Sequence, residues 1–193
     1  MKKRVIVTAL ATGALLVSAA APASAAGHEP GTIVDIAVAA SGGGAPDNNP
    51  YDYDLLVQAV LYTGLEGVLG DPNASLTVFA PNDRAFLTLV KDLTGVAPAS
   101  EADALTTIVA ALSRDQITNV LLYHATAGNL GKVDVNRAKS LTMANGGIVN
   151  PRGVNLRDEG ALTDPRIVRS ASDIQASNGV IHTIDRVLIP GNL

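Results

Sequence analysis

The chain has two sets of residues whose types suit acid–base or metal chemistry: its three histidines and a group of aspartates. His28 lies near the start, His124 follows a helical pattern, and His182 lies in an aliphatic run. A hydrolase needs a nucleophile, a base and a group that orients the base, and these residues meet in space and not in sequence. The chain has no cysteine and no Gly-x-Ser-x-Gly, His-Glu-x-x-His or phosphate-loop motif. The histidines therefore leave a hydrolase open without favouring it, and we predict no catalytic residue.

A structural role competes with a functional one for each histidine. A lone histidine in an aliphatic strand is typically a buried, neutral imidazole with a hydrogen-bonded ring nitrogen, and we predict this state for His182. Burial disfavours the charged ring, so the pKa of His182 should lie below its value in the unfolded chain. For His124, at a change from helix to strand, a structural role and a partly exposed binding role stay equally open.

The aspartates lie in a segment rich in glycine, proline and asparagine. Asp47, Asp52 and Asp54 offer carboxylate oxygens, the ligands that calcium prefers, but the segment lacks the glycine and the distal glutamate of an EF-hand loop. We therefore interpret Asp52 and Asp54 as caps of a helix that begins there. We predict neither a metal site nor a cofactor.

Composition restricts compartment and partner. Residues 1–4 are basic at three positions, an apolar run follows, and small residues lead to Ala25, which is the pattern of a cleaved secretory signal peptide. The signal holds three of the 14 Lys and Arg and none of the 18 Asp and Glu, so the mature chain carries a net charge of −7. This charge argues against a nucleic acid or an anionic membrane as partner. Without cysteine there is no lipid anchor, and we expect a secreted, extracellular protein with no membrane span in the mature chain and no obligate oligomer.

The predicted domain boundaries follow from the first helical pattern. Thr32 with Asp35 predicts a capped helix, residues 41–50 predict an irregular loop, and a second helix opens near residue 52 and ends at Gly64. We predict a signal peptide over 1–25, a flexible segment over 26–31, one domain over 32–190 and a tail over 191–193.

Two strands should position the rest of the domain. Residues 76–80 form a β-prone run that Pro81 ends, and a helix follows with Asn82 or Asp83 as its cap. Ser100 and Ser113 begin two further helices, and short β-prone pieces follow Tyr123. Residues 178–190 predict the longest strand, covered on both faces because aliphatic residues occupy both. Asn178-Gly179 should form its opening turn with backbone that tolerates positive φ, and Asp185 with Arg186 a hydrogen-bonded pair at its end.

Both strands resemble signatures of the fasciclin (FAS1) domain, of the bacterial single-domain type. The run Thr-Val-Phe-Ala-Pro-Asn-Asp-Arg-Ala-Phe over 77–86 resembles the first signature, and Asn-Gly-Val-Ile-His-Thr-Ile-Asp-Arg-Val-Leu-Ile-Pro over 178–190 resembles the second. The signature positions are Thr77, Phe79, Pro81, Asn82, Asp83, Phe86, Asn178, Gly179, His182 and Asp185. The resemblance implies an α+β fold, a β-wedge or sandwich flanked by several α-helices, with the two signature strands adjacent in the core.

The resemblance also implies a function. Tyr123 and His124 stand where the family has its tyrosine–histidine segment, and Asp173 with Ile174 stands where it has an Asp-Ile adhesion motif. These four residues are the partner-binding residues that the resemblance implies, and we expect them to be exposed. In the competing interpretation Tyr123 is a core residue and Asp173 caps a turn.

The resemblance thus favours a secreted, non-enzymatic module for cell adhesion or attachment to extracellular matrix or cell-surface material. Two alternatives remain open, a secreted hydrolase and a carrier of a small apolar ligand held between wedge and helices. The hydrolase needs convergent titratable groups, the carrier needs an apolar cavity, and the adhesion module needs neither.

Overall fold

The computed structural model describes residues 30–191 and residue 193. The predicted signal peptide over 1–25 and most of the predicted flexible segment lie outside the described residues. Within the described part of the chain, no helix combines the length and the apolar character that crossing a membrane requires.

A four-stranded sheet in the order β2-β1-β7-β6 holds the two signature strands at its centre. β1 (Leu76–Pro81) and β7 (Gly179–Ile184) are parallel, from Leu76 opposite Gly179 to Pro81 opposite Ile184. β2 (Ala125–Ala127) and β6 (Ile174–Ala176) pair antiparallel on the two outer sides. All six residues of β7 are buried, as expected of a strand covered on both faces. The predicted adjacency of the two signature strands is confirmed.

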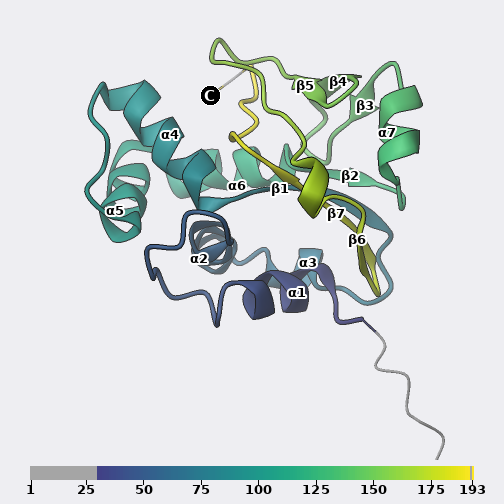
Figure 1. Ribbon diagram of the computed structural model, residues 1–193, viewed down its shortest axis with the longest axis horizontal. Helices are drawn as coiled ribbons and strands as arrows, with labels where there is room; N and C mark the ends of the chain where they lie inside the picture. Colours follow the sequence, from purple (N-terminus) through teal and green to yellow (C-terminus); the bar gives the residue numbers. More distant parts are fainter. Residues whose placement is uncertain (1–29, 192) are drawn as a thin grey trace, which may run out of the picture.

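A smaller three-stranded sheet lies above one end of the central sheet (Figure 1). Its strands are β3 (Leu141–Thr142), β4 (Ile148–Arg152) and β5 (Asn155–Arg157), and the short helix α7 (Lys132–Arg137) lies beside it. A bridge between Thr126 and Met143 joins the two sheets. This arrangement is the β-wedge of the predicted α+β fold.

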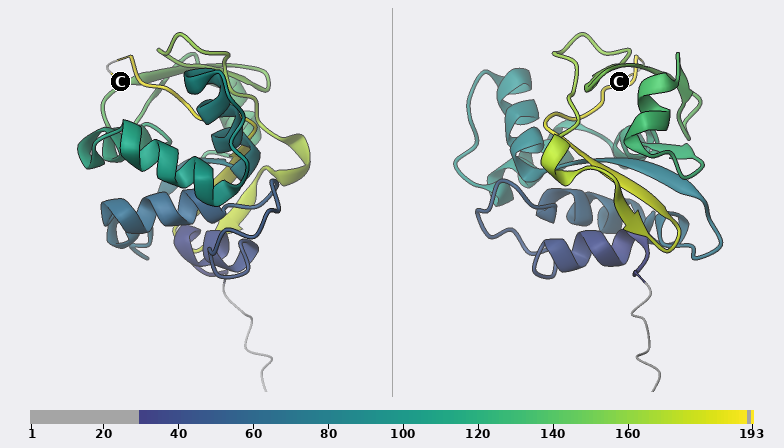
Figure 2. Two further views of the ribbon diagram at one scale, coloured as in Figure 1. Left: turned by 90° about the vertical axis from the view of Figure 1, so that its left-hand side faces the viewer. Right: turned by 45° about the vertical axis from the view of Figure 1, so that its right-hand side comes forward.

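The helices that precede β2 flank the central sheet (Figure 2), and in sequence they fall into two groups, one before β1 and one after it. The bounds of the first group are α1 (Ile33–Ala40), α2 (Asp54–Thr63) and α3 (Glu66–Leu69). Those of the second group are α4 (Asp83–Thr94), α5 (Glu101–Ala111) and α6 (Arg114–Leu122), and a 3₁₀ turn η1 (Arg169–Ala171) precedes β6. The predicted capping boxes at Thr32 and Ser113 are present, and Ser100 and Asn82 cap their helices as predicted.

Two hydrophobic clusters lie on opposite faces of the central sheet. Val78 and Ala80 belong to the cluster under the helices, together with Phe86, while Phe79 between them belongs to the cluster under the wedge. Successive residues of a strand point to opposite faces, so β1 supplies both clusters. The aliphatic residues on both faces of the signature strands are explained by these two cores.

The last signature strand is shorter than predicted. β7 ends at Ile184, because the Asp185 carboxylate accepts a hydrogen bond from Arg166 N at 2.8 Å and turns the chain toward the wedge. Arg186 instead reaches α4, where its guanidinium bonds to the Asp92 carboxylate at 2.9 Å. The predicted pair between Asp185 and Arg186 is therefore wrong, since each side chain binds a different element.

The predicted turn before β7 is present at Ser177 and Asn178, but Asn178 and Gly179 do not serve there as positive-φ positions. Neither is among the residues with positive φ in the described chain. Position 179 requires glycine because the backbone of the neighbouring strand lies too close for a side chain. A Cβ atom there would collide with the Leu76 carbonyl oxygen. The buried Asn178 side chain accepts from Ile33 N at 2.8 Å and donates to Leu69 O at 2.8 Å. It thereby ties α1 and α3 to the start of β7.

Candidate functional site

His182 is buried and has a partner at each ring nitrogen. Nε2 lies 2.8 Å from the Leu130 carbonyl oxygen, and Nδ1 accepts a hydrogen bond from Asp173 N at 3.2 Å. A carbonyl oxygen accepts only, so Nε2 carries the proton and the imidazole is neutral. Burial lowers the pKa of His182, although the Leu130 carbonyl and the charge of Asp173 act in the opposite direction. The prediction of a buried, neutral, hydrogen-bonded ring is confirmed.

His124 is buried in the same way, with the opposite tautomer. Its Nδ1 lies 2.7 Å from the Val120 carbonyl oxygen of α6, and its Nε2 accepts from Leu188 N at 2.9 Å. Burial lowers the pKa of His124 to about 4. With both ring nitrogens of both histidines bonded to backbone, neither ring is placed to take a proton from a nucleophile.

Tyr123 is fully buried beneath the wedge. Its hydroxyl donates to Ile148 O at 2.7 Å and accepts from Glu159 N at 3.2 Å, so it fastens the smaller sheet to the end of α6. Burial, with the charge of Glu159, raises the pKa of Tyr123. The expectation that Tyr123 and His124 are exposed is wrong, because the wedge and the 187–189 segment cover the end of α6 that the sequence leaves uncovered.

Asp173 and Ile174 are half-buried, so this part of the predicted binding segment reaches the surface. Asp173 adopts a φ of 61° and accepts a hydrogen bond from Lys132 N at 2.6 Å. This hydrogen bond, with a smaller contribution from the charge of Lys132, holds the pKa of Asp173 below its usual value. Lys132 Nζ also lies 3.5 Å from Asp173 Oδ2. We call the surface formed by Lys132, Val133, Asp173 and Ile174 the Asp173 corner.

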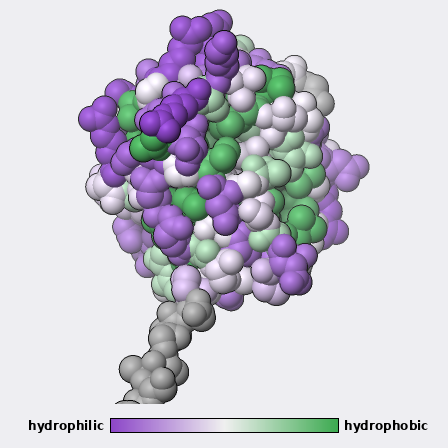
Figure 3. All heavy atoms as spheres, turned by 90° about the vertical axis from the view of Figure 1, so that its right-hand side faces the viewer, coloured by the Kyte–Doolittle hydropathy of each residue, from purple (hydrophilic) through white to green (hydrophobic). Residues whose placement is uncertain are grey.

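Two signature side chains build the Asp173 corner from below. Thr77 donates to Gly128 O at 2.6 Å and accepts from Leu130 N at 2.8 Å, and His182 binds Leu130 O from the next strand. The loop that leads into α7 is thus fixed on both sides, with Asp173 held against its end. Figure 3 shows the face with α7 and β6, where apolar and hydrophilic residues are interspersed.

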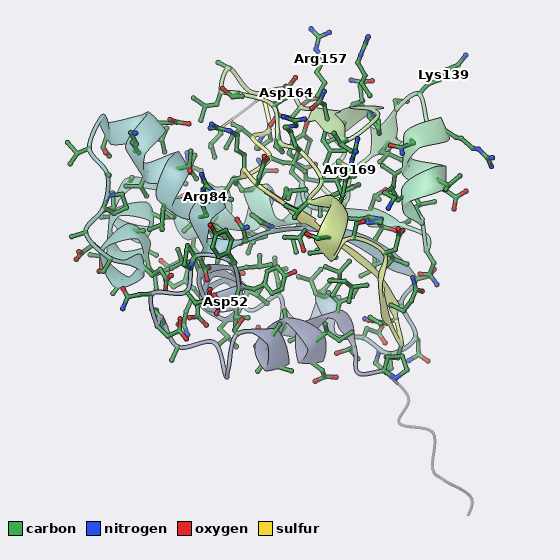
Figure 4. All side chains as sticks on the ribbon, in the orientation of Figure 1. Asp52, Arg84, Lys139, Arg157, Asp164 and Arg169 are labelled. Carbon is green, nitrogen blue, oxygen red and sulfur yellow. The ribbon has the colours of Figure 1, made fainter. Side chains whose placement is uncertain are left out.

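A second polar cluster lies at the start of α2, where the sequence predicts caps. Asp54 Oδ atoms belong to two overlapping groups of carboxylates, one with Asp47 and Asp52 and one with Asp83 and Glu101, each with ligand atoms within 4.8 Å of one another. We call these five residues the acidic cluster; Figure 4 labels Asp52 beside α2. Asp83 binds Asp54 N at 3.1 Å and Leu55 N at 2.8 Å. The prediction that Asp52 and Asp54 cap α2 is wrong, since Asp83 does so from the first signature.

Burial dominates the electrostatics of the acidic cluster. It raises the pKa of Asp54 to about 6, with the charges of Asp52, Asp47 and Glu101 adding to the effect. It raises the pKa of Asp83 to about 8, helped by a contact with the Asp52 carboxyl. The backbone N–H of Asp47 offsets part of the rise at Asp54, but it donates its hydrogen bond to Glu101 at 3.0 Å. α5 thus places a glutamate, Glu101, among these aspartates.

A basic hollow lies on the smaller sheet, and sequence reasoning missed it. It has a volume of about 590 Å³ and its lining includes Arg137, Lys139, Arg152 and Arg157. In Figure 4 Lys139 and Arg157 point away from the molecule. The four basic residues are spread over 21 positions in an acidic chain. The pairing of β4 with β5 places Arg152 and Arg157 in one sheet, and α7 beside β4, with the residues just after it, brings in Arg137 and Lys139.

Two apolar hollows lie on either side of α2. One of about 50 Å³ is lined by residues of α1, α2 and the sheet, including Val34 and His124, and one of about 30 Å³ lies toward α4 and α5. Both are small beside the ~300–1,000 Å³ typical of ligand pockets.

Comparison with known proteins agrees with this geometry. A family model described as the fasciclin domain matches residues 52–190. The chain belongs to the fasciclin domain family. Fasciclin domains are non-enzymatic modules that mediate protein interactions and are usually extracellular. α1 precedes the matched residues, yet the bond from Ile33 N to Asn178 attaches it to the fold; the predicted boundary at residue 32 stays a prediction.

Two curated relatives come from Synechocystis sp. The protein sll1735 is 30% identical over 139 residues, which cover 72% of this chain and 90% of the relative. The protein sll1483 is 29% identical over 138 residues, which cover 72% of this chain and 67% of the relative. A solved FAS1 domain pair from the insect cell adhesion molecule fasciclin I matches 85% of this chain and 52% of its own, with a TM-score of 0.57 and 12% identity. At that identity the structural likeness shows the fold alone.

Proposed function

We propose that this fasciclin-domain protein is a secreted, non-enzymatic attachment module that binds cell-surface or matrix material through the Asp173 corner. The observation that carries the proposal is the construction of this corner: two buried signature side chains, Thr77 and His182, hold a half-exposed ion pair in place. A fixed surface loses little conformational entropy on binding. In this proposal, the buried residues Thr77 and His182 hold the binding surface in place in addition to packing in the core.

The chemistry of the corner suits a protein partner. Lys132 and Asp173 keep 36% and 37% of their side-chain surface, and Val133, which follows Lys132 in α7, is 56% exposed. An apolar side chain beside opposite charges offers both burial and orientation to a partner. β6 at the edge of the central sheet adds an unpaired strand edge close by.

The two alternative functions have less support from the same structure. A hydrolase would need an imidazole nitrogen that faces a nucleophile, whereas all four ring nitrogens of His124 and His182 bind backbone groups. A carrier would need room for its ligand, and the apolar hollows beside α2 measure about 50 and 30 Å³. Tyr123 and His124 have a structural role in this proposal, because their side chains bond to the backbone of the wedge and of the 187–189 segment.

Attachment to bacterial envelope fragments and to immobilised matrix proteins tests the proposal. We compare the wild type with Asp173→Asn and Val133→Glu. Asparagine tolerates the positive φ at position 173 and removes only the charge, and position 133 is exposed, so both variants should fold. We expect each to weaken attachment by about tenfold or more, the effect of losing ~1.4 kcal/mol at an interface hot spot.

Asp115 is an exposed residue in the first turn of α6, so Asp115→Asn is the matched control and should attach like the wild type. A double variant of the basic hollow, Arg152→Ala with Arg157→Ala, tests the competing surface. Undiminished attachment by both corner variants, with circular dichroism showing that they are folded, would remove the Asp173 corner as the binding site. Loss confined to the double variant would assign attachment to an anionic partner in the basic hollow.

A further inference from the structure

The acidic cluster brings together carboxylates from four separate segments. Asp47 and Asp52 come from the loop before α2, Asp54 from the first turn of α2, Asp83 from the start of α4 and Glu101 from the start of α5. Asp54 is common to both groups of oxygens that lie within 4.8 Å. Residues separated by almost fifty positions thus converge on one aspartate.

The oxygens of this cluster are not satisfied within the protein. Asp54 is 0% exposed, and neither of its carboxylate oxygens has a hydrogen-bond partner among the described residues. Asp52 is 6% exposed and its Oδ1 is equally without a partner. A buried carboxylate without partners costs several kcal/mol, so native proteins pair it, protonate it or give it a metal.

In the described part of the chain, no positively charged side chain forms an ion pair with a carboxylate of the acidic cluster. The two ion pairs of that part, Lys132 with Asp173 and Arg186 with Asp92, involve none of the five residues. The N-terminus of α2 supplies two N–H donors, but both bind Asp83. The carboxylates of Asp52 and Asp54 are left facing other carboxylates.

We propose that the acidic cluster binds a divalent cation, and that this cation is calcium. Asp54 is the central ligand, and Asp47, Asp52, Asp83 and Glu101 supply the remaining carboxylate oxygens. The donor set contains oxygen alone, which selects hard cations over zinc or copper. Calcium accepts six to eight oxygens in adaptable geometry, whereas magnesium demands a near-ideal octahedron, so ligands from four segments suit calcium better.

The surrounding loop is built in a way that fits this assignment. Asp47 N and Asn48 N both donate to Glu101 Oε2 at 3.0 Å, and Asn49 Nδ2 donates to Asp52 Oδ2 at 2.9 Å. These bonds fix Glu101 and Asp52, while both Asp54 oxygens and Asp52 Oδ1 stay without a hydrogen-bond partner among the carboxylates of the cluster. The cation then links the 41–53 loop to α2, α4 and α5.

Terbium luminescence tests occupancy of the site in the full mature chain. Terbium replaces calcium at oxygen sites and is excited by a nearby tyrosine, here Tyr53, between two of the ligands. We expect a saturable signal with one ion per chain, displaced by calcium with a dissociation constant below about 1 mM, in the range of extracellular calcium sites. Asp54→Asn should abolish the signal, and Asp115→Asn should leave it unchanged.

Thermal unfolding supplies a second readout that does not depend on terbium. Calcium at about 5 mM should raise the wild-type midpoint by several degrees relative to EDTA, because it binds only the folded chain. Asp54→Asn removes one buried charge and adds two donors for its neighbours, so it should melt above the wild type in EDTA and show no calcium shift. The absence of a calcium shift and of bound terbium in the folded wild type would overturn the proposal and leave the carboxyls protonated instead.

Discussion

The histidine pair and the acidic cluster are both buried polar groups beside the signature strands, yet they are satisfied to very different degrees. Each ring nitrogen of His124 and His182 has a backbone partner between 2.7 and 3.2 Å. Asp54, equally buried, has no partner for either oxygen. Burial alone therefore does not identify a site, because a fully bonded polar group stabilises the fold whereas an unbonded one requires a ligand or a proton.

The two regions also respond to pH in opposite directions. The pKa values of the histidines are lowered, so the unfolded chain takes up protons first and stability is lost as the pH falls from about 6.5. The pKa values of Asp54 and Asp83 are raised from 3.8 to about 6 and about 8, so stability is lost as the pH rises from 3.8 to those values. A cation at the acidic cluster would remove the second loss and leave the first unchanged.

The largest effect should come from the two phenylalanines that anchor the two faces of the central sheet. Phe79 is completely buried and stacks on His182 with ring centroids 5.8 Å apart, while Phe86 lies in the cluster under the helices. Phe79→Ala and Phe86→Ala should each lower the free energy of unfolding by about 3–5 kcal/mol. Urea denaturation measures both, and an unchanged midpoint in either variant would remove that residue from the core.

An intermediate effect should follow from removing the bonds of one histidine while keeping its volume. His124→Phe leaves the Val120 carbonyl and the Leu188 N–H without partners, and each orphaned group costs about 1–3 kcal/mol. The effect should be smaller than that of Phe79→Ala but clear in a urea curve. A variant as stable as the wild type would show that the two hydrogen bonds of His124 do not stabilise the fold, and that the histidine region is no better satisfied than the acidic cluster.

The smallest effect to be measured is the pKa of His182. NMR titration of the wild type should give a value below that of an unfolded histidine, about 6.5, because burial disfavours the charged ring. Asp173→Asn removes the carboxylate that favours the charged ring and should lower the value further. A value near 6.5 in the wild type would contradict the buried, neutral ring on which the Asp173 corner rests.

Local patterns predict the frame of the fold well, and long-range contacts explain what they miss. The helices with Thr32, Asn82, Ser100 and Ser113 as caps are predicted because capping depends on residues three apart. The short helix α7 and the edge strand β6 lack such signals, and the sequence does not predict them. The pairing of β1 with β7 comes from the family resemblance, since about a hundred residues separate the strands.

The candidate site is predicted less well, for the same physical reason. Asp52 and Asp54 have the sequence position of helix caps, but Asp83, nearly thirty residues later, takes that role. Tyr123 and His124 have the position of exposed residues at the end of a helix, but a sheet formed by later residues covers them. Only the prediction for His182 depends on its own strand alone, and it is confirmed.

The free energy of unfolding measured against pH, with and without calcium, tests most directly the claim that the histidine region is complete while the acidic cluster requires a cation. In EDTA, the contribution of Asp54 and Asp83 to stability should fall as the pH rises from the ordinary carboxyl pKa of 3.8 to their raised values of about 6 and about 8. In calcium, the curve should stay level or rise over this range, and the two curves should converge at its acidic end, where protonated carboxyl groups no longer bind the cation. Superimposed curves across the whole range would contradict the account.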